Sequence, residues 1–223
     1  MKRSGFTLLE LIFVITIIAV LAAAAMFYFR SGDNELIQAT NQLARHIRYA
    51  QHLALMDDRF DPSDDVNSSK WYGERWRIRF YDAGSRDYYV IFSDRDNKGG
   101  DPDGTKEIAI DPFSKDRLGR RNNESNEERA GSITHLRANY NTAIQSVSCD
   151  IGNGGQRTMP LSVVFDNKGR VYATPPRYDE DVLGAYEGLV RQNGCIITLR
   201  HLGSGETSTV TIHSETGFVE IAY

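Results

Sequence analysis

The longest apolar stretch of the chain lies near its beginning. The segment GFTLLELIFVITIIAVLAAAAMFYF occupies residues 5–29, and residues 11 to 29 contain no charged side chain. About 20 consecutive apolar residues are enough for a helix to cross the hydrocarbon of a bilayer. The pattern therefore predicts a transmembrane helix over residues 6–29, with one charged residue, Glu10, near its start.

Apolar residues then recur with helical spacing. Intervals of three, four and seven separate Leu36, Leu43, Ile47, Ala50 and Ala54, which is the pattern of an amphipathic helix. We expect a stem helix over residues 30–57, continuous with the first unless Ser31-Gly32-Asp33 ends or bends it. Much of its polar side is supplied by Arg45, His46, Arg48, Gln51 and His52. We expect His46 and His52 to lie in solvent.

Short runs of β-branched and aromatic residues, separated by turn residues, fill the rest of the chain. Such runs are typical of strands, and they occur at 75–82, 87–94, 106–111, 161–166, 195–201, 207–215 and 217–222. Residues 163–172 also suggest a hairpin with a short glycine turn. The expected fold is therefore α+β, with a long N-terminal helix packed on an antiparallel, β-rich head at 58–223.

Composition adds limits on function. A chain of 223 residues can bury one sizeable core, or one core and an appendage. The net charge of −4 argues against a general nucleic-acid binder, which would usually carry a basic face.

The apolar stretch has three interpretations. A cleaved secretory signal has an apolar core of about 7–15 residues, and this stretch is longer. A plain signal anchor fits the length, with Lys2 and Arg3 holding the N-terminus in the cytoplasm. Neither accounts for Glu10, since a charge at mid-bilayer costs on the order of 2.5–3.5 kcal/mol on insertion scales, and less near the interface.

The third interpretation rests on a family resemblance. The sequence Lys2-Arg3-Ser4-Gly5-Phe6-Thr7-Leu8-Leu9-Glu10 resembles the N-terminus of type IV prepilins and type II secretion pseudopilins. The resemblance implies that a prepilin peptidase removes residues 1–5 by cutting between Gly5 and Phe6. Phe6 then becomes the N-terminus and is N-methylated, while the apolar helix is retained.

The same resemblance assigns Glu10 a role in assembly. Phe6 and Glu10 lie about 6 Å apart along a helix axis, and a carboxylate near a helix N-terminus is favoured by the helix dipole. The resemblance implies that Glu10 faces the Phe6 amine of a neighbouring subunit. The competing interpretation is that Glu10 reaches the lipid headgroups.

A second resemblance concerns the C-terminal half. The segments VVFDNKGRVYATP and CIITLRHLGSGETSTVTIHSETGFVEI resemble those of H-type minor pseudopilins and FimT-type minor pilins, and WRIRFYD with YYVIF resembles that group's first hairpin. The matching positions are Phe165, Gly169, Thr198, Val210, Gly217 and Val219. This resemblance implies a minor rather than a major subunit.

Two cysteines, Cys149 and Cys195, stand in the head. Thiols exposed to an oxidising compartment commonly pair, so we expect a disulfide between them; two separate buried thiols are the alternative. Their spacing does not match a metal site.

Other candidate chemistry is sparse. The acidic stretch 94–104 has the oxygen density of a calcium loop, but Lys98 replaces a ligand and the EF-hand glutamate is missing, which favours a plain loop. Ser204 stands in a Gly-Ser-Gly turn, and no hydrolase, zinc-protease or nucleotide-binding motif occurs. We expect no enzyme, no metal and no cofactor.

The sequence thus predicts a pilin-like structural subunit. Its expected partners are other pilin or pseudopilin subunits, the prepilin peptidase, an assembly platform and the inner membrane, with a cytoplasmic N-terminus and a periplasmic head. Two alternatives stay open. One is a membrane-anchored periplasmic binding module that uses the 94–104 loop. The other is a competence-type minor pilin that binds DNA through Arg117, Arg120 and Arg121.

Overall fold

The structure is a computed structural model of the chain. It describes residues 8–28, 31–58, 71–81, 87–95, 102, 104, 106–119, 132–174 and 188–223; for residues 23–28, 31–33 and 174 it describes the backbone alone.

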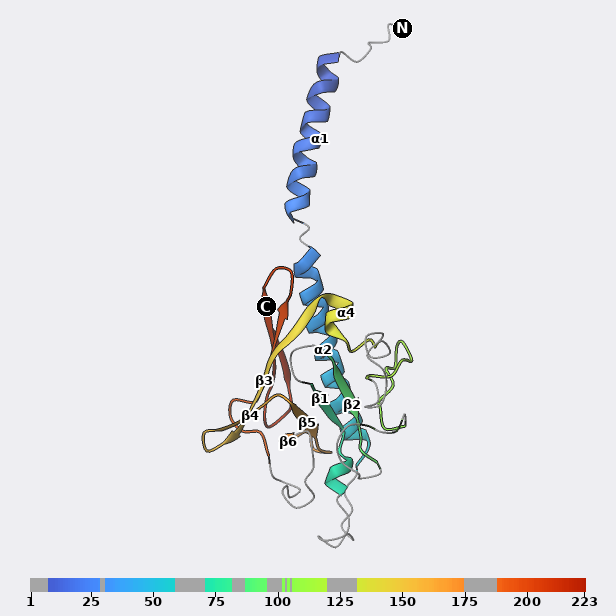
Figure 1. Cartoon of the computed structure of the whole chain (residues 1–223), viewed down its shortest axis with the longest axis vertical. Helices are drawn as coiled ribbons and strands as arrows, with labels where there is room; N and C mark the ends of the chain where they lie inside the picture. The colour runs from blue at the N-terminus through green and yellow to red at the C-terminus, as the bar shows by residue number, and fades with distance from the viewer. Residues whose placement is uncertain are drawn as a thin grey trace.

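Two helices open the described chain. Helix α1 spans Leu8–Tyr28 and helix α2 spans Ser31–Met56. In Figure 1, α1 projects away from the head, whereas α2 runs into it. Residues 29 and 30, which join α1 to α2, lie outside the described residues, and the predicted continuity of the helix stays a prediction.

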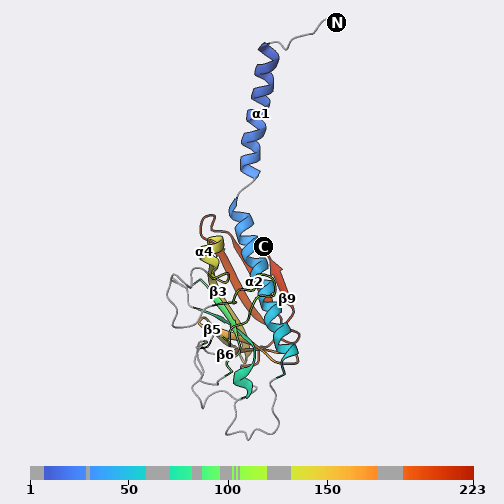
Figure 2. The ribbon, with the colours of Figure 1, turned by 90° about the vertical axis from the view of Figure 1, so that its right-hand side faces the viewer.

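Helix α2 attaches to the head through the predicted apolar stripe. Its five members have side chains exposed by 5% or less: Leu36, Leu43, Ile47, Ala50 and Ala54. The stripe packs against the inner face of strands β7 (Cys195–His201), β8 (Thr207–Ile212) and β9 (Val219–Ala222), along which α2 lies lengthwise in Figure 2. Each fully buried Leu or Ile contributes about 1.5–3 kcal/mol, so this stripe fixes α2 on the sheet.

The described residues of the head form two antiparallel sheets. One has the order β2-β1-β5-β6, formed by β1 (Arg77–Phe80), β2 (Tyr89–Phe92), β5 (Leu161–Phe165) and β6 (Val171–Thr174). The other has the order β4-β3-β7-β8-β9, in which β3 is Thr142–Gly152 and β4 is Gly155–Thr158. A short 3-10 helix η1 (Trp71–Glu74) precedes β1, and a short helix α4 (Leu136–Tyr140) precedes β3.

Most predicted strands are present. The runs at 75–82, 87–94, 161–166, 195–201, 207–215 and 217–222 contain β1, β2, β5, β7, β8 and β9. The 163–172 hairpin is confirmed by the antiparallel pair β5–β6 and by the hydrogen bond from Gly169 N to Asp166 O. The run at 106–111 was predicted as a strand but makes only isolated bridges, at Ile108 and Ile110. Strands β3 and β4 were not predicted.

The observed architecture is therefore an N-terminal helix followed by antiparallel sheets, and the expected α+β class is confirmed.

Candidate functional site

Helix α1 carries the part of the predicted N-terminal signal that the structure describes. Glu10 lies in its first turn, where the positive end of the helix dipole favours a carboxylate. Gly5 and Phe6, the predicted cleavage residues, lie outside the described residues. The structure therefore places Glu10 at the start of a helix without placing its predicted partner.

The described side chains of α1 are exposed. The large apolar ones have exposed fractions from 41% to 77%: Leu8, Leu9, Leu11, Ile12, Phe13, Val14, Ile15, Ile17, Ile18, Val20 and Leu21. The hydroxyl of Thr16 donates to its own helix, with Oγ1 at 2.9 Å from Ile12 O and 2.8 Å from Phe13 O. Because the Thr16 hydroxyl is already hydrogen-bonded within the helix, the surface of α1 is effectively apolar at this position as well. Among the described residues, no helix is long and apolar enough to cross a membrane.

Hydrogen bonds tie α2 to the head along its length. Near its start, Glu35 Oε2 lies 3.0 Å from His201 Nε2. Further along, Thr40 Oγ1 lies 2.6 Å from Ser208 Oγ in the interior. Toward its end, Arg48 donates to Val219 O at 2.9 Å. With the apolar stripe, these bonds hold α2 and the β7–β9 strands as one unit.

The contact at Glu35 also brings together a serine, a histidine and a carboxylate, which the sequence did not reveal. Ser204 Oγ lies 3.0 Å from His201 Nδ1, so the three groups are arranged like a catalytic triad. However, the backbone N–H of Ser204 donates to Nδ1 at 2.9 Å, and Ser204 Oγ donates to Glu206 Oε2 at 3.2 Å. Because a general base needs a free lone pair toward the nucleophile, these bonds close a turn rather than activate Ser204.

The prediction that His46 lies in solvent is wrong. It was expected in solvent, but its side chain is 5% exposed, and Nδ1 lies 2.6 Å from the Tyr89 hydroxyl. Burial lowers the pKa of His46 to about 4; Asp111 opposes this shift and Arg45 adds to it. The imidazole is therefore neutral at pH 7. The other predicted solvent residue, His52, is exposed.

A cleft lies beside His46, between α2 and the turn at 110–114. Its volume is about 240 Å³, and it is lined by Gln42, Arg45, His46, Tyr49, Asp111, Pro112, Phe113, Ser114 and Ile133. The Tyr49 hydroxyl donates to Ile110 O at 3.0 Å, which fixes the turn to α2. Burial alone would raise the pKa of Asp111, but the hydrogen bonds from Ser114, together with His46 and Arg45 nearby, lower it overall. The cleft therefore holds an ionised carboxylate next to Arg45.

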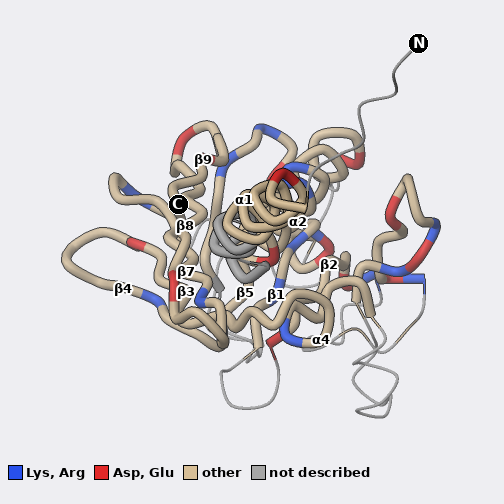
Figure 3. Tube along the Cα trace, turned by 90° about the horizontal axis from the view of Figure 1, so that it is seen from above, with Lys and Arg blue, Asp and Glu red and all other residues tan. Residues whose placement is uncertain are grey.

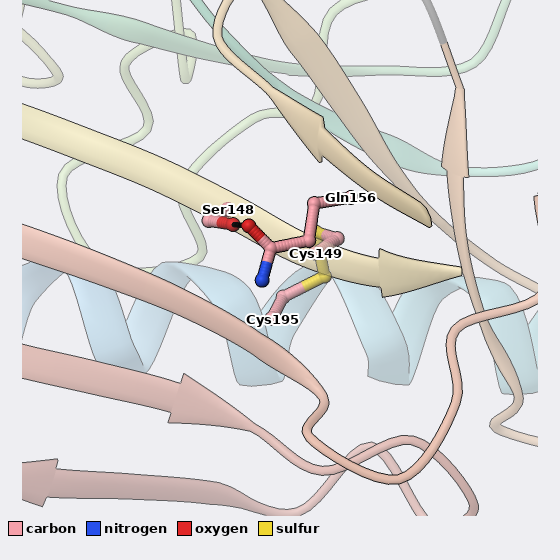
Figure 4. The surroundings of a disulfide bond; sticks show 4 residues. All are labelled: Ser148, Cys149, Gln156 and Cys195. Carbon is pink, nitrogen blue, oxygen red and sulfur yellow. Dashed lines mark hydrogen bonds between the residues drawn. A yellow bond between two sulfur atoms is a disulfide. The ribbon is translucent and has the colours of Figure 1, made fainter. Parts of the chain in front are cut away.

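The two cysteines are joined. Figure 4 shows the disulfide between Cys149 on β3 and Cys195 on β7. The two residues are direct partners in the β3–β7 register, with Cα atoms 4.0 Å apart, and both are fully buried. Closing a loop of this length stabilises the fold by about 4 kcal/mol in the chain-entropy model. The disulfide therefore links two strands that are neighbours in the sheet but far apart in the sequence.

The remaining candidates are only partly placed. Of the 94–104 loop, the structure describes residues 94, 95, 102 and 104, and among all described residues no group of three potential ligands could hold a metal ion. Arg117 is exposed, whereas Arg120 and Arg121 lie outside the described residues.

Comparison with known proteins identifies the N-terminal signal. Residues 1–26 match the family model described as the prokaryotic N-terminal methylation motif, which is the signal of type IV pilins and pseudopilins. No curated protein and no solved structure matches the chain. The chain thus combines this motif with an exposed apolar helix and a head that is rich in antiparallel strands.

Proposed function

We propose that this chain is a pilin-like structural subunit that a prepilin peptidase processes between Gly5 and Phe6. The mature chain begins at N-methylated Phe6. The observation that carries the proposal is the methylation motif at 1–26, which includes most of helix α1 and its exposed apolar surface. Such a helix needs a lipid or protein environment, because its apolar surface is costly in water.

The chain then divides into four parts. Residues 1–5 are the leader, 6–29 anchor the subunit in the inner membrane, 30–57 form the stem, and 58–223 form a periplasmic head. On assembly the 6–29 helix leaves the lipid and packs among the same helices of neighbouring subunits. The resemblance to H-type minor pseudopilins supports a minor subunit of a type II secretion pseudopilus or a type IV pilus.

In this proposal, Glu10 sets the axial position at which a subunit packs against its neighbours. In lipid, a carboxylate paired with the Phe6 ammonium of a neighbour costs far less than two unpaired charges. A subunit that stacks out of register would leave both charges unpaired, so the pair favours one axial position.

Replacement of Glu10 tests this role. We expect Glu10→Gln and Glu10→Val to be processed normally but to enter purified filaments about tenfold less than the unchanged chain, since breaking a buried ion pair costs several kcal/mol. Thr16→Val is the matched control, because Thr16 lies on the same helix and its hydroxyl bonds only to its own backbone in the described structure. Quantitative immunoblots of filaments and membranes provide the measurement. Equal incorporation of the Glu10 variants and the unchanged chain would refute the role.

A further inference from the structure

The sequence contains two Asn-Gly pairs, Asn153-Gly154 and Asn193-Gly194, and both lie in the described head. An asparagine that precedes glycine is open to a spontaneous reaction, in which the backbone nitrogen of the glycine attacks Cγ of the asparagine. Glycine favours this reaction because it has no side chain beside the attacking nitrogen. Both asparagines are exposed, so contact with water does not distinguish the two pairs. Their hydrogen bonds do.

The first pair forms the tip of the β3–β4 hairpin. Asn153 and Gly154 have φ of +54° and +73° and connect the paired residues Gly152 and Gly155, which is the pattern of a two-residue type I′ turn. Among the described residues, neither the Asn153 side chain nor the Gly154 N–H makes a hydrogen bond, and a Cβ at Gly154 would meet nothing within 4 Å. Figure 1 and Figure 3 show this hairpin reaching out sideways from the head. The tip can therefore change conformation without breaking contacts to the rest of the molecule.

The second pair is held in place by its surroundings. The Asn193 side chain donates from Nδ2 to Asp150 Oδ2 at 2.8 Å, and the Asn193 backbone N–H donates to the same oxygen at 3.3 Å. The Gly194 N–H, on the nitrogen that would attack, donates to Arg191 O at 2.8 Å, and Gly194 O accepts from Asp150 N at 3.0 Å. A Cβ at Gly194 would collide with the backbone oxygen of Ile212. Strand β8 thus leaves this turn little room to move.

These differences bear directly on the reaction. Attack requires the backbone to rotate until the glycine nitrogen reaches Cγ of the asparagine, so the rate follows the free energy of local opening. At the hairpin tip, opening disturbs only the two-residue turn and the adjacent Gly152–Gly155 pair. At Asn193, the bonds to Asp150 and Arg191 must break first. Each such bond adds to the cost of opening, so the same dipeptide should react at very different rates at the two positions.

We propose that Asn153 is a deamidation site of the folded protein and that Asp150 protects Asn193 from the same reaction. The Gly154 nitrogen forms a bond to Cγ of Asn153 and gives up its proton to water. The bond from Cγ to the side-chain nitrogen breaks, and this nitrogen takes a proton from water and leaves as ammonia. Water then opens the resulting succinimide at one of its two carbonyl groups, which yields aspartate or isoaspartate. No oxidant or reductant is needed, and the proposal does not depend on the proposed function.

Either product changes the hairpin. Both place a carboxylate where a neutral amide stood. Isoaspartate also lengthens the main chain by one methylene, which a two-residue turn between Gly152 and Gly155 cannot accept without a change in the pairing of β3 with β4. Strand β4 lies at the edge of the five-stranded sheet and pairs with β3 alone. Deamidation would therefore mark older copies of the protein by a more acidic and more loosely paired sheet edge.

Peptide mapping of aged protein tests the proposal. The full-length chain, purified in detergent, is kept in mildly alkaline buffer made with heavy-oxygen water, either folded or unfolded in guanidinium chloride. Mass spectrometry measures the replacement of NH₂ by labelled OH at each asparagine, and electron-transfer fragmentation distinguishes isoaspartate from aspartate. In the folded chain we expect the Asn153 amide to be lost about tenfold faster, or more, than the Asn193 amide. In guanidinium chloride, where the turns no longer exist, we expect comparable rates.

Substitution of Asp150 tests the protection of Asn193. Asp150→Ala removes the acceptor of two of its hydrogen bonds and should raise the rate at Asn193 about tenfold; its thermal unfolding transition shows whether the variant is folded. Asp116→Ala, at an exposed aspartate outside both turns, is the matched control and should change neither rate. Asn153→Gln should abolish the product at the hairpin tip, because glutamine would have to form a larger ring, and should leave Asn193 unaffected.

The contradicting outcomes are specific. An Asn153 amide that is lost no faster than the Asn193 amide in the folded chain overturns the deamidation site. A folded Asp150→Ala variant whose Asn193 is as stable as in the unchanged chain overturns the protection by Asp150. Neither outcome affects processing between Gly5 and Phe6, so the proposed function stands or falls separately.

Discussion

The buried His46 shows how a single residue can mislead a prediction from sequence. In the sequence it is one of several polar residues opposite the apolar stripe of α2. In the structure, it lies one turn from Leu43 and Ala50 and packs against Tyr89 from the neighbouring sheet. The buried side of α2 is therefore wider than its apolar residues indicate. No local pattern reveals this, because the covering groups come from distant parts of the chain.

Neutral His46 predicts a pH dependence of stability. The folded-state pKa is about 4, below the ordinary value of about 6.5, so between these values the unfolded chain binds a proton that the folded chain does not. The free energy of unfolding should therefore fall by about 3 kcal/mol as the pH is lowered from 6.5 to 4. Urea unfolding at several pH values measures this loss.

His46→Gln should remove that part of the pH dependence, whereas His52→Gln, at an exposed position of the same helix, should keep it. An unchanged pH profile in the His46 variant would show that the imidazole is not responsible.

Asp166 is a second residue whose contribution to the stability of the fold can be predicted. Its carboxylate accepts hydrogen bonds from Lys168 N at 2.9 Å, from Arg170 N at 2.9 Å and Nε at 2.7 Å, and from the Tyr172 hydroxyl at 3.1 Å. Burial alone would raise the pKa of Asp166, but the hydrogen bonds from Lys168 and Arg170, together with the charge of Arg170, lower it overall. The ionised carboxylate thus organises the β5–β6 turn, and its stabilisation is present at neutral pH and is lost as the pH falls through the lowered pKa.

Asp166→Ala should lower the free energy of unfolding by about 1–3 kcal/mol at pH 7, since buried donors lose their acceptor. The difference from the unchanged chain should shrink in acid, where the carboxylate is protonated. Chemical denaturation at pH 7 and in acid measures both values; a difference independent of pH would contradict the role of the charge.

Strand β3 shows why a strand can escape prediction from the sequence pattern. Predicted strands such as 195–201 alternate regularly between buried and exposed residues, as β7 does. In β3, Thr142 and Ile144 are buried, but so are Val147 and Cys149, because a bulge between Ile144 and Ser146 shifts the register by one residue. A bulge interrupts the period of two, so the longest strand of the head escaped prediction. Two short alternating runs offset by one residue are the signal that would have revealed it.

Two glycines, Gly154 in the β3–β4 turn and Gly194 in the turn before β7, allow a matched test of backbone strain. Gly154 and Gly194 both have positive φ, +73° and +66°, but a Cβ at Gly154 would meet nothing, whereas one at Gly194 would collide with the backbone oxygen of Ile212. Both alanine variants lose the left-handed preference of glycine, which costs about 1–2 kcal/mol. We expect Gly194→Ala to lower the melting temperature clearly more than Gly154→Ala, and equal losses would show that the close approach to β8 is not rigid.

For the whole molecule, some features can be predicted from the sequence and others arise only from the fold. The methylation motif and Glu10 are visible in the first residues, and the class of the fold follows from the helical stripe and the strand runs. The cleft beside His46 is not visible in the sequence, because only the fold brings together the residues that line it, such as Arg45 and Asp111. Contacts of this kind are a property of the folded head and cannot be predicted from local sequence patterns.

Processing by a prepilin peptidase is tested by the intact mass and N-terminal sequence of the chain, extracted from membranes of cells with and without that peptidase. We expect a mature chain that begins at N-methylated Phe6 only when the peptidase is present. A chain that still begins at Met1 in both strains would contradict it.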